Sequence, residues 1–130
     1  MDLILDTTIC IEAFRGNETD IDENKKVYIP IIAIGELYFG IYNFFRKHGN
    51  KKKYESELKK MEIFLRKDFL TFDQETANEY GIIKDQLRSK GLKVQENDVW
   101  ISALAKSNNL KLLTKDKSFE DVEGLEVGFA

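Results

Sequence analysis

Short apolar runs alternate along this chain with longer segments in which apolar residues recur at helical spacing. The apolar runs have the length of buried strands, and they cover residues 3–5, 27–29, 69–72, 111–114 and 125–129. The helical segments lie between them, and they cover residues 9–14, 32–47, 54–67, 75–90 and 97–107. Two neighbouring strands run parallel when a helix joins them, because the crossover returns the chain to the starting edge of the sheet. The alternation therefore predicts an α/β fold with a mainly parallel central sheet that helices flank on both faces.

Local signals mark the ends of several helices. Thr7 or Thr8 is expected to cap the first helix, because a threonine hydroxyl accepts a hydrogen bond from a free N–H of the first turn. Gly16 and Gly91 each follow a helical segment, and glycine readily adopts the left-handed conformation that ends many helices. Pro30 stands just before the second helix, where its missing N–H is tolerated. These signals predict several short helices, each with its own start or stop signal.

The length and composition of the chain suit one domain. The chain has 130 residues, 42% of them hydrophobic, and a single proline. This size supports one hydrophobic core, and no low-complexity linker divides the sequence. We therefore expect residues 1–130 to form a single domain.

The rare residues exclude several functional classes. Cys10 is the only cysteine and His48 the only histidine, so an internal disulfide, a cysteine-based zinc site and a ribonuclease that uses a histidine pair are all excluded. The N-terminal segment MDLILDTT has no basic region, and no apolar run approaches the length of a bilayer span. We therefore expect a soluble, cytoplasmic protein that has no membrane partner.

Four acidic residues stand where this fold would bring them together. Asp6 and Asp116 each follow a predicted strand, and the carboxyl ends of parallel strands share one edge of the sheet. Asp98 begins a predicted helix. Taken alone, each of these three acids is more simply explained as a turn former or a helix cap. Glu36 differs because it lies in the apolar segment IIAIGELYFGIYNFF, where a carboxylate needs a metal, a basic partner or an opening to solvent.

Carboxylates of this kind suit a hard divalent cation. Mg²⁺ and Mn²⁺ prefer carboxylate and water oxygens, and they need neither histidine nor cysteine. The four acids together therefore predict a divalent-metal site at the carboxyl edge of the sheet.

The order of four segments resembles a known family. LILDTTICIE near the start, GELYFG, NDVWISALA and finally LLTKDKSFEDVEGLEV follow one another as in the PIN domain. The chain is most similar to the VapC-type toxins of bacterial and archaeal toxin–antitoxin pairs, and the resemblance covers nearly all of it. It implies a three-layer PIN-like fold and an Mg²⁺- or Mn²⁺-dependent endoribonuclease that a cognate antitoxin holds inactive.

The resemblance also implies roles for individual residues. The family's catalytic and metal-binding acids carry over onto Asp6, Glu36, Asp98 and Asp116. Thr114 carries over as a supporting hydroxyl, and Thr7 is a second candidate for that role. Many relatives have an acid immediately before the phenylalanine of the last motif, whereas this chain has Ser118 before Phe119. The fourth acidic position therefore rests on Asp116.

The acids suggest a mechanism beside that resemblance. A metal held by Asp6, Glu36 and Asp98 would lower the pKa of a bound water and orient it toward an RNA phosphodiester. A second ion near Asp98 and Asp116 would stabilise charge on the departing 3′ oxygen, and the sequence leaves open whether one or two ions bind. The alternative is a catalytically silent binding or regulatory module with the same fold. Retention of all four acids favours the enzyme.

The apolar helix at 31–45 has more large side chains than one buried helix face accommodates. A wholly buried core helix explains this composition, and so does contact with another chain. The resemblance favours the second explanation, namely a homodimer and an apolar groove for an antitoxin helix. We expect the antitoxin to lie near Tyr38 and Tyr42 and to extend an Arg or Lys toward Glu36 and Asp98.

Positive charge is concentrated in the middle of the chain, although the net charge is −3. The cations occur at residues 46–53 and again at 59–67. An RNA-binding patch and a solvated lysine-rich helix face both explain them.

Overall fold

The computed structural model describes residues 1–130 and contains one parallel sheet with helices on both faces. The strands are β1 (Leu3–Leu5), β2 (Val27–Pro30), β3 (Phe69–Leu70), β4 (Lys111–Thr114) and β5 (Val127–Phe129). The helices are α1 (Thr7–Phe14), α2 (Ile31–His48), α3 (Lys51–Phe64), α4 (Gln74–Ser89), α5 (Glu96–Ser107) and the 3-10 helix η1 (Lys117–Asp121). The strand order is β3-β2-β1-β4-β5, and every neighbouring pair is parallel. The predicted α/β fold is confirmed.

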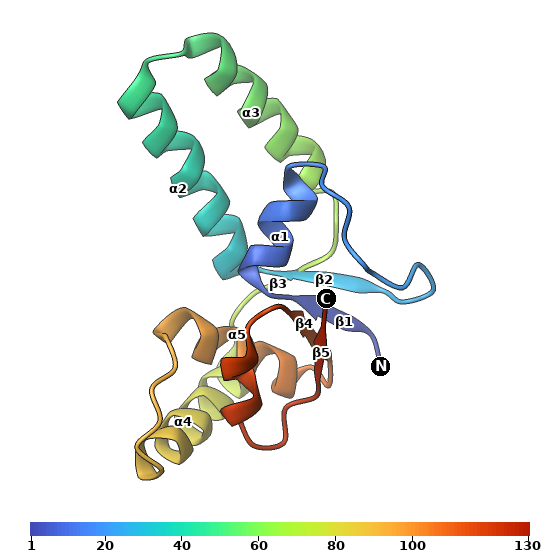
Figure 1. Ribbon diagram of the computed structural model, residues 1–130, viewed down its shortest axis with the longest axis vertical. Helices are drawn as coiled ribbons and strands as arrows, with labels where there is room; N and C mark the ends of the chain where they lie inside the picture. The colour runs from blue at the N-terminus through green and yellow to red at the C-terminus, as the bar shows by residue number, and fades with distance from the viewer.

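Alternate residues of the central strands face opposite helical layers, because side chains along a strand point to opposite faces of the sheet. Leu5 and Leu113 are buried in a core cluster with α1, α2 and α3. Ile4 and Leu112 are buried with α5 and η1 instead. Figure 1 shows α1, α2 and α3 on one side of the sheet and α4 and α5 on the other. The fold therefore has the three layers that were predicted.

The first helix begins directly after the first strand, and Asp6 caps it. Asp6 has an extended backbone, and its Oδ1 accepts a hydrogen bond of 2.7 Å from the backbone N–H of Thr7. Thr7 and Thr8 are already helical, so the predicted threonine cap was wrong. The carboxylate lies at the end of the strand, and it is the stronger acceptor for the first free N–H. Asp6 is thereby held at the carboxyl edge of the sheet.

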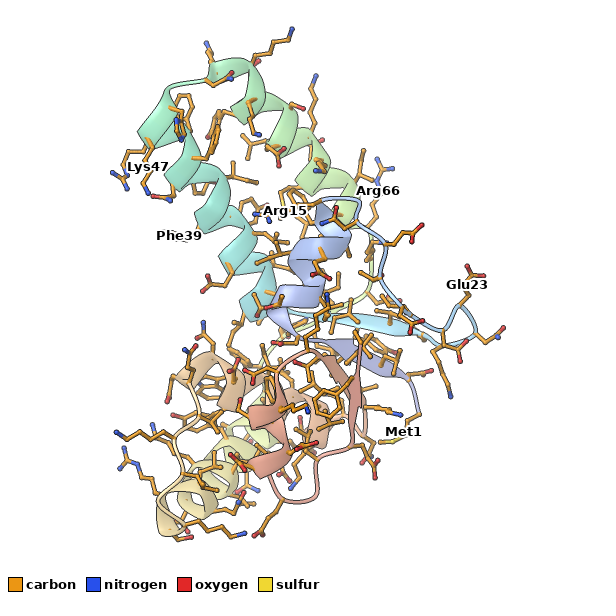
Figure 2. All side chains as sticks on the ribbon, viewed as in Figure 1. Met1, Arg15, Glu23, Phe39, Lys47 and Arg66 are labelled. Carbon is orange, nitrogen blue, oxygen red and sulfur yellow. The ribbon has the colours of Figure 1, made fainter.

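The second and third helices form a hairpin that extends away from the sheet (Figure 1). The third helix begins at Lys51, three residues earlier than predicted, and ends at Phe64 rather than at residue 67. Asn50 explains the early start, because its side chain accepts a hydrogen bond of 3.0 Å from the backbone N–H of Lys53. Gly49 has a φ of 63°, which lets the chain reverse within two residues. Figure 2 shows Phe39 and Lys47 on the side of α2 that faces away from α3.

The remaining differences from prediction are small. β3 and β5 have two and three residues, shorter than the predicted runs, and each pairs with a single neighbour at a sheet edge. The bounds of β1 and β4 agree with prediction. None of the helices combines the length and the hydropathy that a bilayer crossing requires.

Candidate active site

All four predicted acids line one pocket at the carboxyl edge of the sheet. The pocket has a volume of about 630 Å³, and none of its nine lining residues is hydrophobic. The lining residues are Asp6, Thr7, Thr8, Glu36, Gln95, Asn97, Asp98, Lys115 and Asp116. Because every strand runs in the same direction, residues that follow β1 and β4 meet Glu36 of the second turn of α2 and the first turn of α5 here.

Asp6 is the most buried acid of the pocket, with an exposed fraction of 5%. Its Oδ2 accepts a hydrogen bond of 2.8 Å from Thr114 Oγ1, in addition to the bond from Thr7. Burial raises the pKa of Asp6, the hydrogen bonds from Thr114 and Thr7 oppose that rise, and the charge of Asp116 adds to it. Asp6 is therefore a carboxylate in a fixed orientation whose charge is only partly compensated.

Thr114 joins two of the acids, because its fully buried hydroxyl has two partners. It donates to Asp6 and accepts a hydrogen bond of 3.0 Å from the backbone N–H of Asp116. Asp116 itself is exposed, and its Oδ1 accepts from the backbone N–H of Ser118 at 2.9 Å, which caps η1. Asp116 is thus both a turn former and a pocket residue, so the two explanations considered for it coexist.

Asp98 lies half-buried in the first turn of α5. Burial, and then repulsion from Asp6 and from Asp116, raises the pKa of Asp98 to about 6. No ion pair involves any of these three carboxylates. The pocket therefore concentrates negative charge that the protein's own cations leave uncompensated.

Glu36 lies on an exposed face of α2, although its neighbours in sequence are largely apolar. Leu37 and Ile41 point into the core instead. Of the metal, the basic partner and the opening to solvent that were expected for Glu36, the structure shows the opening to solvent. Glu36 Oε1 accepts a hydrogen bond of 3.2 Å from Asn97 Nδ2. Asn97 was missed in the sequence analysis, and its position beside Asp98 in a helical first turn was the available signal.

Lys115 is the one cation that lines the pocket. Its Nζ lies 2.9 Å from Glu12 Oε1 and 3.1 Å from Oε2, so its charge is largely directed to that carboxylate. Thr8 and Gln95 also line the pocket and were not predicted. Their side chains add to its polar lining.

The donor set of the pocket fits a hydrated divalent cation. No three of the acidic side chains converge closely enough to ligate one ion directly. Mg²⁺ commonly keeps several waters and takes only one or two carboxylates from a protein, so direct ligation by three is not required. Burial contributes most to the raised pKa of Asp98 and repulsion from Asp6 and Asp116 contributes the rest, and a divalent ion would offset that repulsion.

The metal-free protein should be more stable near pH 5 than near pH 7.5. The folded state binds a proton at Asp98 with a pKa of about 6, above the ordinary value of 3.8, so it holds more protons than the unfolded state between these values. The free energy of unfolding therefore decreases as the pH rises from about 3.8 to about 6, and it remains at the lower value at higher pH. Thermal unfolding in EDTA, followed by circular dichroism, measures the difference.

Asp98→Asn is the control for this pH dependence. It removes the titrating group with little change in shape, so it should reduce the difference between the two pH values. A melting temperature of the unmodified protein that is higher near pH 7.5 would contradict the raised pKa.

Comparisons with known proteins agree with the fold. Residues 3–125 match the model of the PIN domain family. Ribonuclease VapC2 of Rickettsia felis is 28% identical, and that of Haemophilus influenzae is 31% identical; each match covers 94% of this chain and 92% of the relative.

Solved structures give the same result. The crystal structure of VapBC2 from Rickettsia felis bound to a DNA fragment has a TM-score of 0.82 at 26% identity, covering 99% of this chain and 98% of that one. A member of the VapBC family of toxin-antitoxin systems from Mycobacterium tuberculosis has a TM-score of 0.72 at 22% identity, with the same coverage, and shows the fold alone. The protein therefore belongs to the PIN domain family and, within it, to the VapC ribonucleases.

Proposed function

We propose that this protein is an Mg²⁺- or Mn²⁺-dependent endoribonuclease that acts as the toxin of a toxin–antitoxin pair. The observation that carries the proposal is the polar pocket that four carboxylates line, in which burial and the charges of Asp6 and Asp116 raise the pKa of Asp98. The relatives named ribonucleases support RNA as the substrate. Incubating the purified protein with single-stranded RNA, in Mg²⁺ and in EDTA, tests it. Intact RNA under both conditions would favour the alternative, a silent binding or regulatory module.

The metal would be held directly by one or two of the carboxylates of Asp6, Glu36, Asp98 and Asp116, and by the others through bound water. When bound, such an ion supplies an activated water and stabilises charge on the phosphodiester. The protein's own residues orient the carboxylates for this role. Thr114 fixes Asp6 and Asp116 through one hydroxyl, and Asn97 holds Glu36 toward the first turn of α5.

Asp116→Asn should reduce RNA cleavage only partly, by about tenfold, whereas Asp6→Asn should abolish it. Asp116 is exposed at the pocket edge, and an asparagine there keeps an oxygen that can accept from Ser118 or contact a metal. Asp6 is buried between two donors, where loss of its charge cannot be replaced by solvent. Initial cleavage rates at saturating Mg²⁺ measure both variants. Complete inactivation of both variants would contradict the prediction that Asp6 contributes more to cleavage than Asp116.

The proposed antitoxin would lie along α2. Tyr42 and Phe39 have exposed fractions of 51% and 64%, which is unusual for large apolar side chains. Tyr38 stacks on Tyr42 with ring centroids 6.1 Å apart, so the two rings form one surface. A cation that reached from this surface toward Glu36 would meet the uncompensated charge of the pocket. The similarity to a VapBC2 structure supports such a partner.

A homodimer is the proposed oligomeric state. The exposed apolar residues of the helices supply surface for it as well as for an antitoxin. Size-exclusion chromatography with light scattering would measure the mass of the purified protein, and a monomer across the micromolar range would contradict the proposal.

A further inference from the structure

The tip of the α2–α3 hairpin carries a concentration of positive charge. Five cations and no acidic residue occur within residues 46–53, and all five are exposed. We call this set the basic tip, and it consists of Arg46, Lys47, Lys51, Lys52 and Lys53. The basic tip lies at the end of the hairpin farthest from the sheet (Figure 1). The chain as a whole has a net charge of −3, so any attraction for a polyanion must be local in this way.

The charges of the basic tip are not neutralised within the protein. The five ion pairs of the structure all lie elsewhere. Arg46 donates a hydrogen bond of 2.9 Å to the neutral amide of Asn43, and Lys53 Nζ lies 4.7 Å from the ring centroid of Phe44. These contacts position the two cations and leave their charge available.

Helix stability explains only two of the five cations. Arg46 and Lys47 lie in the last turn of α2, where the negative end of the helix dipole favours them. The three lysines at 51–53 lie in the first turn of α3, which contains no acid, and there the positive end of the dipole opposes them. A lysine run at this place costs stability locally. An external polyanion would account for it.

The hairpin connects the basic tip rigidly to the acidic pocket. Glu36 and Lys47 lie on the same helix, eleven residues apart. At about 1.5 Å per residue, the tip is roughly 17 Å from the pocket along the helix axis. Stacked nucleotides spaced by about 3.4 Å cover that distance in about five residues of RNA.

We propose that the basic tip binds phosphates of the RNA substrate about five nucleotides away from the bond placed in the acidic pocket. This inference rests on the proposed function and adds a second contact to it. The tip attracts the RNA backbone without reading its sequence, and the pocket, which itself repels phosphate until a metal is bound, receives the strand.

Salt-dependent binding tests the proposal. Asp6→Asn serves as the background so that RNA is bound without being cleaved, and the probe is a fluorescently labelled single-stranded RNA of twelve nucleotides. Lys51→Gln with Lys52→Gln removes two tip charges that make no ion pair or hydrogen bond through their side chains. Each lost phosphate contact lowers the slope of log Kd against log salt by about 0.7 for a single strand, so the slope should fall by about 1.4. The loss of affinity at low salt should be about tenfold and should grow with RNA length from four to twelve nucleotides.

A matched double variant distinguishes an effect of the basic tip from an effect of the protein's net charge. Lys25→Gln with Lys93→Gln makes the same change in net charge at exposed lysines outside the hairpin, and it should leave the slope unchanged. The tip variant should also melt no lower than its background, because two cations opposed by the dipole of α3 are removed. Equal slopes for the two double variants would overturn the proposal.

Two further outcomes would also overturn it. If the tip variant binds RNA normally but loses affinity for the antitoxin, the tip is an antitoxin contact. If it binds RNA normally but becomes monomeric by light scattering, the tip joins two copies of the chain. Cleavage by the unmodified protein in Mg²⁺ is measured separately. If the unmodified protein cleaves RNA and the two double variants have equal salt slopes, only the proposed role of the basic tip is refuted. If the tip variant has a reduced slope and the unmodified protein does not cleave RNA, only the proposed function is refuted.

Discussion

Asp98→Asn should abolish RNA cleavage and at the same time raise the melting temperature of the metal-free protein. Burial and repulsion from Asp6 and Asp116 raise the pKa of Asp98 to about 6, so its ionisation at neutral pH costs the folded protein free energy that the unfolded chain does not lose. Asparagine has nearly the same shape and no charge. Because Asp98 is half exposed, solvent screening leaves about 1 kcal/mol of the gain, or roughly 4 °C for a chain of this size. Cleavage should fall by about a thousandfold or more, which corresponds to about 4 kcal/mol of lost transition-state stabilisation.

Glu96→Gln is the matched control for this variant. Glu96 lies in the same first turn of α5, but it contacts Tyr80 and Lys84 and does not line the pocket. The control removes one carboxylate from the same helix end, so it should keep full cleavage and should not raise the melting temperature. Unfolding in EDTA and cleavage in Mg²⁺ are measured on the same preparations. Normal cleavage by a folded Asp98→Asn protein would refute the assignment of the site.

The periodicity of apolar residues predicted the sheet well, because the central strands are buried on both faces. Leu3–Leu5 and Lys111–Thr114 pair with each other at the centre of the sheet, and their bounds agree with prediction. A strand buried on both sides has consecutive apolar residues, such as Leu112 and Leu113, so its position is visible in the sequence. β3 and β5 are edge strands, and pairing on one side only does not fix their length.

Competing local rules explain the errors at helix ends. The lysine run at 51–53 argues against a helix that starts there, because cations are unfavourable in the first turn of a helix. The cap from Asn50 overrides that preference, and α3 begins at Lys51. Both Asp6 and the two threonines that follow it are residue types that cap helices, so the sequence alone does not separate them; the extended backbone at Asp6 makes it the cap of α1.

The sequence indicated which acids line the pocket, but it did not indicate the hydrogen bonds that hold them there. Parallel strands necessarily bring Asp6 and Asp116 to one edge, so the meeting of these two acids in the pocket follows from topology. The bond between Asn97 and Glu36 depends on how two distant helices pack, and no local pattern encodes it. The exposure of Glu36 depends likewise on which face of α2 meets the core.

Tyr42→Asp should weaken binding of the proposed antitoxin by about thirtyfold or more while leaving RNA cleavage by the free protein intact. Tyr42 is 51% exposed on α2 and stacks on Tyr38, which makes it a suitable anchor for an apolar partner segment. A carboxylate there loses the apolar contact and stays solvated in the free protein. The affinity of the purified antitoxin is measured by isothermal titration calorimetry, and the pocket is monitored by cleavage of single-stranded RNA in Mg²⁺.

The control for this last variant is Ile63→Asp, which introduces the same carboxylate at an apolar residue of α3 that is 62% exposed. It should leave the antitoxin affinity unchanged, because it does not lie on the helix that carries Glu36. Tyr42 also lies 6.2 Å from Tyr54 between ring centroids, so circular dichroism must first establish that the variant is folded. If the folded Tyr42→Asp protein binds the antitoxin as tightly as the Ile63→Asp protein does, the antitoxin lies elsewhere. In that case a cation reaching Glu36 would have to approach the pocket from the α5 side, past Asn97.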